Sequence, residues 1–429
     1  MSRALTEAAL LLDIERLTFG FDALAHDGRH VVFVPYGAPG DRVAARVVER
    51  RGGYLRARID CVAVPGPDRV LPGCRYFPTC GGCQWQHVAP AAQRAAKAAI
   101  VAEQLARIAG IRDADIRPTI PSPTDWGYRA RITLAVDGRR AGYRRARSHD
   151  LVEIDDCPIA EPVLSAHLGA AREWIRTLRA PLRRVTICAA PGGVALAATA
   201  TGRPGPADRA ASEALLARIA TVRGTVVSGG GERLVAGDPT VRVPLEAGLD
   251  LEVPADVFTQ VNGGANRTLI ETVLSLGGFA AGERVLDLYC GAGNLSLPIA
   301  RRGAVVLGIE QSDVAVAAAR ANATRHRLAS ATFRAARVAD ALREISPDAS
   351  DAVIDTVVLD PPRTGATDAL PPLAALRPRR IVYVSCDPPT LARDVQRLAG
   401  QGYRLGRVQP IDLFPQTYHV ESVAELHLT

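Results

Sequence analysis

The chain has 429 residues, of which 48% are hydrophobic and 23% charged, and its 51 arginines and single lysine contribute to a formal net charge of +7. This length exceeds what one hydrophobic core serves, and the composition excludes a disordered or fibrous protein, so we expect two or three globular domains. No apolar run approaches the roughly 18 residues of a membrane span, which excludes a transmembrane protein and predicts a cytoplasmic one without a targeting sequence.

The first 64 residues contain short apolar stretches separated by turn residues. These stretches are Ile14–Leu17, Val31–Val34, Val43–Val48 and Leu55–Ile59. Short strands at this spacing predict a small β-barrel in residues 1–64. The proline- and glycine-rich residues 64–67 then predict a linker.

Eight cysteines in a chain without a secretory signal argue against a disulfide framework and for metal or catalytic duty. Four of them could act together, because Cys74, Cys80 and Cys83 are close in the sequence and Cys157 can supply a fourth thiolate. Four thiolates suffice for an iron–sulfur cluster, and the glycines between Cys80 and Cys83 leave room for a bulky inorganic core. The spacing differs from the paired motifs of common zinc sites, yet zinc stays open as the alternative.

An alanine-rich helix is predicted from about residue 91 to 109, ended by Gly110. Weaker strand and helix signals follow and predict an α+β domain over residues 65–255. The strand signals are Arg131–Val136, Arg184–Cys188 and Gly193–Ala198, and the helical signal is Ala170–Leu178.

Seven arginines between residues 129 and 147 form a basic run in this central domain, with Tyr128 and Tyr143 interleaved. They are Arg129, Arg131, Arg139, Arg140, Arg144, Arg145 and Arg147. Such a pattern can supply phosphate contacts and stacking to RNA, although a solvated basic face explains each single arginine almost equally well. The net charge alone does not show that the protein binds nucleic acid, since a GC-rich genome also explains the arginine bias.

Residues 256–429 alternate nearly continuous apolar strands with helices. The strand signals are Arg284–Tyr289, Val305–Ile309, Thr356–Leu359 and Ile381–Val384. Such runs are typical of a parallel sheet covered on both faces, so we expect an α/β domain of the Rossmann type here.

A glycine turn follows the first of these strands, in the stretch Asp287-Leu-Tyr-Cys-Gly-Ala-Gly-Asn294. The third glycine of a dinucleotide fingerprint is absent, because Ser296 stands there, which disfavours a pyrophosphate cofactor. Glu310 ends the next strand and can accept from ribose hydroxyls, and we expect Asp340 at the end of the third strand, where it can accept from an adenine amine. This pattern predicts a class I methyltransferase, with an unrelated doubly wound fold as the alternative.

Two further motifs follow the fourth and fifth strands, at the edge where open α/β sheets bind ligands. They are Asp360-Pro-Pro-Arg363 and Val384-Ser-Cys-Asp-Pro388. The prolines stiffen the loop that carries Asp360, and Cys386 would stand where a flipped base could sit. A buried structural cysteine is the usual alternative at a strand end, and we expect Cys188 and Cys290 to be of that kind.

Together with Phe258-Thr-Gln-Val-Asn262 and His419-Val-Glu421, these motifs make the chain resemble the RNA uracil-C5 methyltransferase family of the RumA/TrmA type along nearly its whole length. The resemblance implies S-adenosylmethionine as methyl donor, Cys386 as nucleophile and Glu421 as base. It also implies that a set of residues lines the cofactor and base pockets: Gln260, Tyr289, Asn294, Glu310, Asp340 and Asp360.

The resemblance further implies a [4Fe–4S] cluster on Cys74, Cys80, Cys83 and Cys157, because members of the family hold one with this pattern. Gly20, Val31-Val-Phe-Val-Pro35 and Pro39-Gly-Asp41 resemble a TRAM domain, an RNA-binding barrel of the OB type. A TRAM domain with a cluster points to 23S rRNA over tRNA as the substrate. We expect a monomer that binds RNA and no membrane.

The chemistry of uracil explains why a thiol and a base are both needed. Carbon 5 is a poor nucleophile until a thiolate adds to carbon 6, and a base must afterwards remove the carbon 5 proton. Two rival functions stay open at this point. One is an amino-directed base methyltransferase, which needs no nucleophilic cysteine, and the other is an iron–sulfur RNA-binding protein whose methyltransferase fold is inactive.

Overall fold

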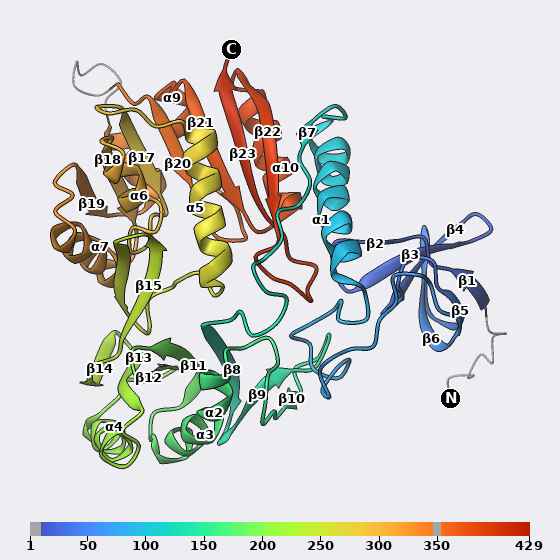
Figure 1. Cartoon of the computed structure of the whole chain (residues 1–429), viewed down its shortest axis with the longest axis horizontal. Helices are drawn as coiled ribbons and strands as arrows, with labels where there is room; N and C mark the ends of the chain where they lie inside the picture. Colours follow the sequence, from blue (N-terminus) through green and yellow to red (C-terminus); the bar gives the residue numbers. More distant parts are fainter. Residues whose placement is uncertain (1–9, 346–352) are drawn as a thin grey trace.

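The computed structural model describes residues 10–345 and 353–429, and Figure 1 shows three parts, with one long helix between the N-terminal and C-terminal parts. The N-terminal part is a curled sheet in the order β1-β5-β6-β4-β3-β2, with alternate side chains such as Val32 and Val34 buried inside it. Its strands are β1 (Leu10–Asp13), β2 (Arg16–Leu17), β3 (Asp22–Asp27), β4 (His30–Pro35), β5 (Arg42–Arg51) and β6 (Tyr54–Val64). The predicted β-barrel is therefore present in outline, with β3 as a strand that the sequence pattern did not indicate.

The central part is a second sheet, in the order β10-β9-β8-β11-β12-β13-β14, with three helices against it. Its strands are β8 (Arg131–Asp137), β9 (Arg140–Arg144), β10 (Leu151–Val152), β11 (Leu182–Ala190), β12 (Gly193–Ala200), β13 (Val222–Gly229) and β14 (Glu232–Gly237). Its helices are α2 (Pro162–Ala166), α3 (Leu168–Thr177) and α4 (Pro206–Arg218). Trp174 of α3 is fully buried in the core between the helices and the sheet.

The C-terminal part is an eight-stranded sheet in the order β19-β18-β17-β20-β21-β23-β22-β7, covered by helices on both faces. Its strands are β7 (Asp115–Ile116), β17 (Arg284–Leu288), β18 (Val305–Glu310), β19 (Ala331–Ala335), β20 (Thr356–Leu359), β21 (Arg380–Ser385), β22 (Tyr403–Ile411) and β23 (Glu421–Leu428). Its helices are α5 (Gly263–Gly277), α6 (Ser296–Arg301), α7 (Asp313–Arg325), α8 (Val338–Glu344), α9 (Leu370–Ala375) and α10 (Pro388–Ala399).

The strands β17 to β21 pair in parallel, whereas β23 runs antiparallel to β21 and β22. The chain order reverses between β17 and β20, and this switch point is where open α/β sheets bind ligands.

The alanine-rich helix α1 (Pro90–Gln104) continues into the π-helical turn η1 (Leu105–Ala109) and ends at Gly110, whose φ of 74° is the left-handed conformation that glycine adopts easily. It lies between the barrel and the C-terminal part (Figure 1). Ile100 belongs to the core of the barrel, whereas Val101 and Leu105 belong to the core around β20 and β21. One helix therefore holds two domains together.

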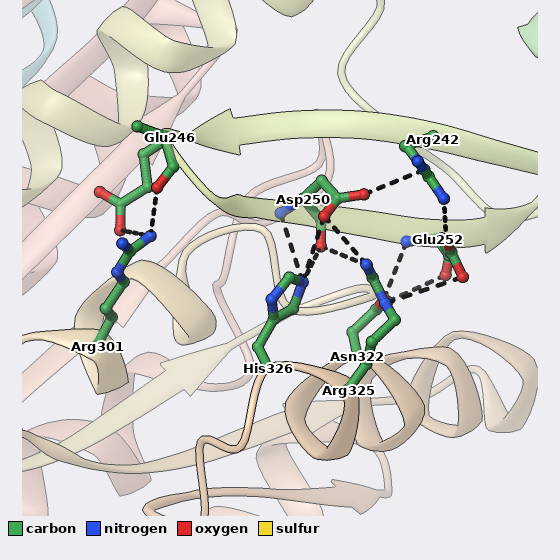
Figure 2. A network of polar contacts seen from close by, with 9 residues as sticks. Arg242, Glu246, Asp250, Glu252, Arg301, Asn322, Arg325 and His326 are labelled. Carbon is green, nitrogen blue, oxygen red and sulfur yellow. Dashed lines mark hydrogen bonds and ion pairs between the residues drawn. The ribbon is translucent and has the colours of Figure 1, made fainter. Parts of the chain in front are cut away.

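A hairpin of β15 (Thr240–Glu246) and β16 (Leu249–Pro254) connects the central part to the C-terminal one and packs against α5 and α7. Figure 2 shows the polar contacts at its edge, where Arg325 and His326 reach Asp250. Asn322 pairs with the backbone of Glu252, donating to its carbonyl at 3.0 Å and accepting from its amide at 2.9 Å. The Asn322 side-chain amide thus forms the same pair of hydrogen bonds with Glu252 that the backbone of a neighbouring strand would form.

In the described ranges, 10–345 and 353–429, no helix has both the length and the apolar character that a bilayer crossing requires.

Candidate active site

The predicted reactive residues meet at the carboxyl edge of the C-terminal sheet. Asp360 follows β20, Cys386 follows β21, and Glu421 is the first residue of the antiparallel strand β23. Because β20, β21 and β23 are neighbours in the sheet, these three side chains come together although the chain separates them by up to 61 positions.

The thiol of Cys386 is protonated in the free protein. Burial and the neighbouring Glu421 and Asp360 carboxylates together raise its pKa to about 12, although the nearby Arg363 guanidinium acts in the opposite direction. The positive charge of Arg363 therefore does not outweigh burial.

Glu421 is a buried carboxyl group beside Asp360. Its side chain is 2% exposed, and its Oε1 atom has no hydrogen-bond partner. Burial raises the pKa of Glu421 well above its usual value, and the nearby Asp360 raises it further. Burial raises the pKa of Asp360 itself to about 7, so the two carboxyls resist carrying two negative charges at once.

Arg363 is held from the other side by His419. The His419 Nε2 atom lies 3.3 Å from the Arg363 guanidinium. Burial lowers the pKa of His419 to about 3, and the Arg363 charge lowers it further, so the ring is neutral and can accept from the arginine. His419 was part of a sequence motif without an assigned role, and its contact with Arg363 supplies one.

The glycine turn after β17 is stabilised by a hydrogen bond between Asp287 and Ser296. Tyr289 adopts a left-handed φ of 64°, and Gly293 a φ of 95° that only glycine adopts easily. Asp287 accepts a hydrogen bond from the Ser296 hydroxyl, and burial raises the pKa of Asp287 to about 7. Asp287 therefore braces the turn through Ser296.

Four of the predicted cofactor residues surround this turn. The Glu310 carboxylate accepts from the amides of Gly291 at 3.3 Å and Ser312 at 2.8 Å. Asn294 exchanges two hydrogen bonds, of 2.8 and 2.9 Å, with the fully buried Asn266 of α5. The remaining two predicted cofactor residues here are Tyr289, within the turn, and Gln260, whose Nε2 atom lies 3.5 Å from the Asp360 carboxylate.

Asp340 is not at the end of the third strand, and that expectation was wrong. Strand β19 ends at Ala335, the chain turns, and Asp340 lies in the first turn of α8. An acidic residue is favoured there because the helix N-terminus carries partial positive charge. Its exposed carboxylate pairs with Arg343 at 2.7 Å.

The four predicted metal-binding cysteines line one cavity of about 190 Å³ at the border of the central domain. These are Cys74, Cys80, Cys83 and Cys157. Burial raises the pKa of Cys80 to about 11 and that of Cys83 to about 12, and the neighbouring thiols raise both further. Cys188, on β11, and Cys290, after β17, are buried elsewhere, in a core cluster that extends from the central sheet to the C-terminal part, as expected of structural cysteines.

The basic run of the central domain divides into two groups and two single residues, namely Arg129, which lines the cysteine cavity, and Arg140, which pairs with Glu153. Arg131 donates to the carbonyls of Val257 and Ala255, and Arg139 donates to carbonyls at the end of α3, so both serve the fold. Arg144, Arg145 and Arg147 line a cavity of about 400 Å³ with Phe21 of the barrel. Only this second group combines positive charge with an aromatic ring on an open surface.

The chain is similar to RNA methyltransferases along nearly its whole length. The 23S rRNA (uracil(1939)-C(5))-methyltransferase RlmD of Thiobacillus denitrificans is 38% identical over 414 residues, covering 93% of this chain and 94% of that protein. The chain belongs to the RNA uracil-C5 methyltransferase family. RlmD of Aeromonas salmonicida is 35% identical and covers 96% of both chains. A family profile described as tRNA (Uracil-5-)-methyltransferase matches residues 246–428.

The fold agrees with this family. The Pyrococcus abyssi tRNA (uracil-54, C5)-methyltransferase, solved in complex with S-adenosyl-L-homocysteine, superposes with a TM-score of 0.71 at 26% identity and covers 97% of this chain and 100% of that one. The family, the enzyme class and the fold class predicted from the sequence are therefore confirmed, namely a class I methyltransferase domain with an N-terminal barrel.

Proposed function

We propose that this enzyme methylates carbon 5 of a uridine in 23S rRNA, the one equivalent to uridine 1939, with S-adenosylmethionine as donor. The observation that carries the proposal is the meeting of Cys386, Glu421 and Asp360 at the sheet edge, in a chain whose full-length relatives are named for that uridine. Since ribosomal RNA is the substrate, we place the enzyme in the cytoplasm. We take it to be a monomer.

The residues around the glycine turn fit the methyl donor. Glu310 at the end of β18 can accept from ribose hydroxyls, and we expect Gln260, Tyr289, Asn294 and Asp360, near the switch point, to contact the rest of the donor. The donor supplies an electrophilic methyl group when bound. We keep Asp340 as a candidate adenine ligand, although it would have to exchange its pairing with Arg343 for that role.

Cys386 opens the reaction by adding its sulfur to carbon 6 of the uracil and releasing its proton. The electrons of the carbon 5–carbon 6 double bond then make carbon 5 nucleophilic enough to accept the methyl group. Glu421 next takes the proton from carbon 5, the sulfur–carbon bond breaks, and the double bond returns. The raised pKa of Glu421 suits this step, because a carboxylate with a higher pKa is a stronger base.

Because the two residues act at different steps, the roles of Cys386 and Glu421 can be distinguished by experiment. We expect Cys386→Ala to form no covalent RNA adduct and to transfer no methyl group. We expect Glu421→Gln to transfer the methyl and then to stay attached to its product, because only the later proton removal is lost. The attached species is a slowly migrating band on a denaturing gel that contains radiolabel from the donor methyl. An active Cys386→Ala variant would move the enzyme to the amino-directed class.

A tRNA substrate is the second candidate, because the Pyrococcus abyssi structure is named for uracil 54 of tRNA. The rRNA proposal is preferred since the rRNA-named relatives match at 35–38% identity, against 26% for the tRNA enzyme. Mass-spectrometric mapping of 5-methyluridine in total RNA from a deletion strain decides between them. Loss from 23S rRNA supports the proposal, and loss from tRNA alone contradicts it.

We also propose a [4Fe–4S] cluster on Cys74, Cys80, Cys83 and Cys157. All four line one cavity, and Arg129 lies beside it with a buried guanidinium whose Nε atom has no hydrogen-bond partner. No carboxylate pairs with Arg129 within the described ranges, so an anionic group in the cavity would balance its charge. The spacing of the four cysteines differs from the paired motifs of common zinc sites, which favours an iron–sulfur cluster over zinc.

Iron and sulfide analysis of protein purified without oxygen tests the cluster. We expect about four irons and a brown colour, since four thiolates are the usual complement of one such cluster. Cys83→Ser should lower the iron content and the melting temperature while leaving the affinity for S-adenosylmethionine unchanged, because the cavity is remote from the glycine turn. Stoichiometric zinc without visible absorbance would contradict the proposal.

For RNA binding we propose the TRAM-like barrel together with Arg144, Arg145 and Arg147. Arg147 lies over the ring of Phe21 at 5.5 Å, so the barrel and the central domain contribute to one surface. Phe258, close in sequence to Gln260, is 68% exposed and offers a second aromatic ring near the catalytic edge. Positive charge and free aromatic faces are what single-stranded RNA requires.

A further inference from the structure

The only lysine of the chain is buried in the interior of the protein. Lys97 is 0% exposed, in a sequence whose other 51 basic residues are arginines. Its ammonium group donates to the Asp412 carboxylate at 2.5 Å and to the Phe414 carbonyl at 3.0 Å. The ammonium also lies 5.9 Å from the centre of the Trp85 ring. A compact ammonium fits this pocket, whereas the planar fork of an arginine is larger and donates in fixed directions.

Burying an ion pair of this kind is unfavourable unless the pair is well bonded, because both charges lose their water. Asp412 is 1% exposed, so neither partner is solvated. An apolar side chain would fill the same space on α1 without that penalty. Stability alone therefore does not explain the two hydrogen bonds of Lys97, which both reach the same segment of the chain.

They hold residues 412–420, the segment that leads from β22 to Glu421. This segment lies outside helices and strands, and residues from other parts of the chain fix its path. Gln93, one turn before Lys97 on α1, exchanges hydrogen bonds of 2.9 and 3.1 Å with Gln416, which has a left-handed φ of 68°. Tyr128 donates to the Pro415 carbonyl at 2.9 Å.

A continuous series of hydrogen bonds runs from Lys97 to the catalytic edge. The Phe414 carbonyl that accepts from Lys97 also accepts from the Thr417 hydroxyl, at 2.8 Å. The Thr417 hydroxyl accepts from the His419 amide at 3.3 Å, and the His419 ring contacts Arg363. Arg363 lies beside Cys386, and Glu421 follows His419 by two residues.

We propose that Lys97 is a positioning residue for methyl transfer: by binding Asp412 and the Phe414 carbonyl, it fixes residues 412–420 so that His419 holds Arg363 beside Cys386 and Glu421 stands at the sheet edge. This rests on the proposed function for the identity of the catalytic residues. It adds that α1, which lies outside the catalytic sheet, sets the geometry of the base and of the cation beside the nucleophile.

Three variants test the proposal. Lys97→Met leaves the Asp412 charge buried and unpaired, so its stability falls. Lys97→Met combined with Asp412→Leu removes both charges and keeps the volume similar, so its melting temperature recovers, but the donor to the Phe414 carbonyl is still missing. Glu103→Gln is the control, because it breaks the exposed ion pair of the same helix with Arg16 and leaves residues 412–420 untouched.

Each variant is measured by melting temperature, by calorimetric titration with S-adenosylmethionine, by amide hydrogen exchange of residues 413–419, and by single-turnover methylation of unmodified 23S rRNA. In the double variant we expect the affinity for S-adenosylmethionine to stay within twofold of the parent (~0.4 kcal/mol). We expect exchange to be at least about tenfold faster, as for a segment that opens locally, and methyl transfer about tenfold slower per binding site. The control should match the parent in every measurement.

Parent-like exchange and methyl transfer in the double variant would overturn the proposal and leave Lys97 as a filler of the core. A loss of donor affinity in parallel with activity would also overturn it, because the damage would then be general. If the parent enzyme itself does not methylate the RNA, the proposed function fails, and the exchange measurement still decides whether Lys97 holds the segment.

Discussion

The thiol of Cys386 is surrounded by two carboxyls and one guanidinium, and burial outweighs the guanidinium. Because only the thiolate reacts with iodoacetamide, we expect the alkylation rate of Cys386 to rise about tenfold per pH unit between about pH 7 and pH 10, without a plateau. The sign follows from the raised pKa of about 12, since the thiolate fraction still increases throughout this range. Peptide mass spectrometry after timed quenching gives the rate.

Arg363→Met serves as the matched variant in the same measurement. Its loss removes the one charge that lowers the Cys386 pKa, so alkylation should be slower at every pH. Exposed Cys61 in the same digest shows that the reagent is active. A plateau near neutral pH in the parent would mean that the thiolate already exists before substrate binds.

The functional residues that belong to sequence motifs were predicted. The residues whose role depends on a partner far away in the sequence were missed. Asp360 and Cys386 each follow a predicted strand, so periodicity placed them at one edge, whereas Glu421 was named through the family resemblance. Asn266 bonds to Asn294 across 28 positions and Lys97 to Asp412 across 315, and no local pattern reports such pairs. The sole lysine was a compositional signal, but its meaning required the fold.

At the scale of elements, the glycine turn depends on α5. Asn266→Ala removes both hydrogen bonds to Asn294 and should weaken binding of S-adenosylmethionine by about 1.4 kcal/mol, which is about tenfold in Kd. Isothermal titration measures this directly. Asn266→Asp keeps the acceptor and loses the donor, so its Kd should fall between those of Ala and the parent, and equal affinity in all three proteins would show that α5 does not support the turn.

Elements with strong periodicity were predicted closely, and irregular ones were not. The helix expected from residue 91 to 109 occupies 90 to 109, with Gly110 as its end. Strand β3 was missed because its sequence, Asp-Ala-Leu-Ala-His-Asp, is short and polar at both ends. Asp340 was misplaced because β19 ends five residues earlier than expected, at Ala335, where the Ala336 amide bonds back to Glu310.

At the scale of the whole molecule, the hairpin of β15 and β16 attaches the central domain to the catalytic one. Asn322→Leu leaves the Glu252 amide and carbonyl without partners and should lower the free energy of unfolding by about 2 kcal/mol. Arg242→Gln breaks only exposed ion pairs of the same network (Figure 2) and should change it by less than about 0.5 kcal/mol. Urea denaturation followed by fluorescence compares them, and equal effects would contradict the docking role of Asn322.

The burial of the one lysine also allows the contact between the barrel and the catalytic domain to be measured by proteolysis. Endoproteinase Lys-C has a single possible cutting site in this chain, after Lys97 in α1, and the native fold hides it between the barrel and the catalytic sheet. Cleavage therefore requires an opening event in which α1 separates from both the barrel and the catalytic sheet and exposes Lys97. The rate at which two fragments appear on a gel therefore measures how often the molecule opens between the barrel and the catalytic domain.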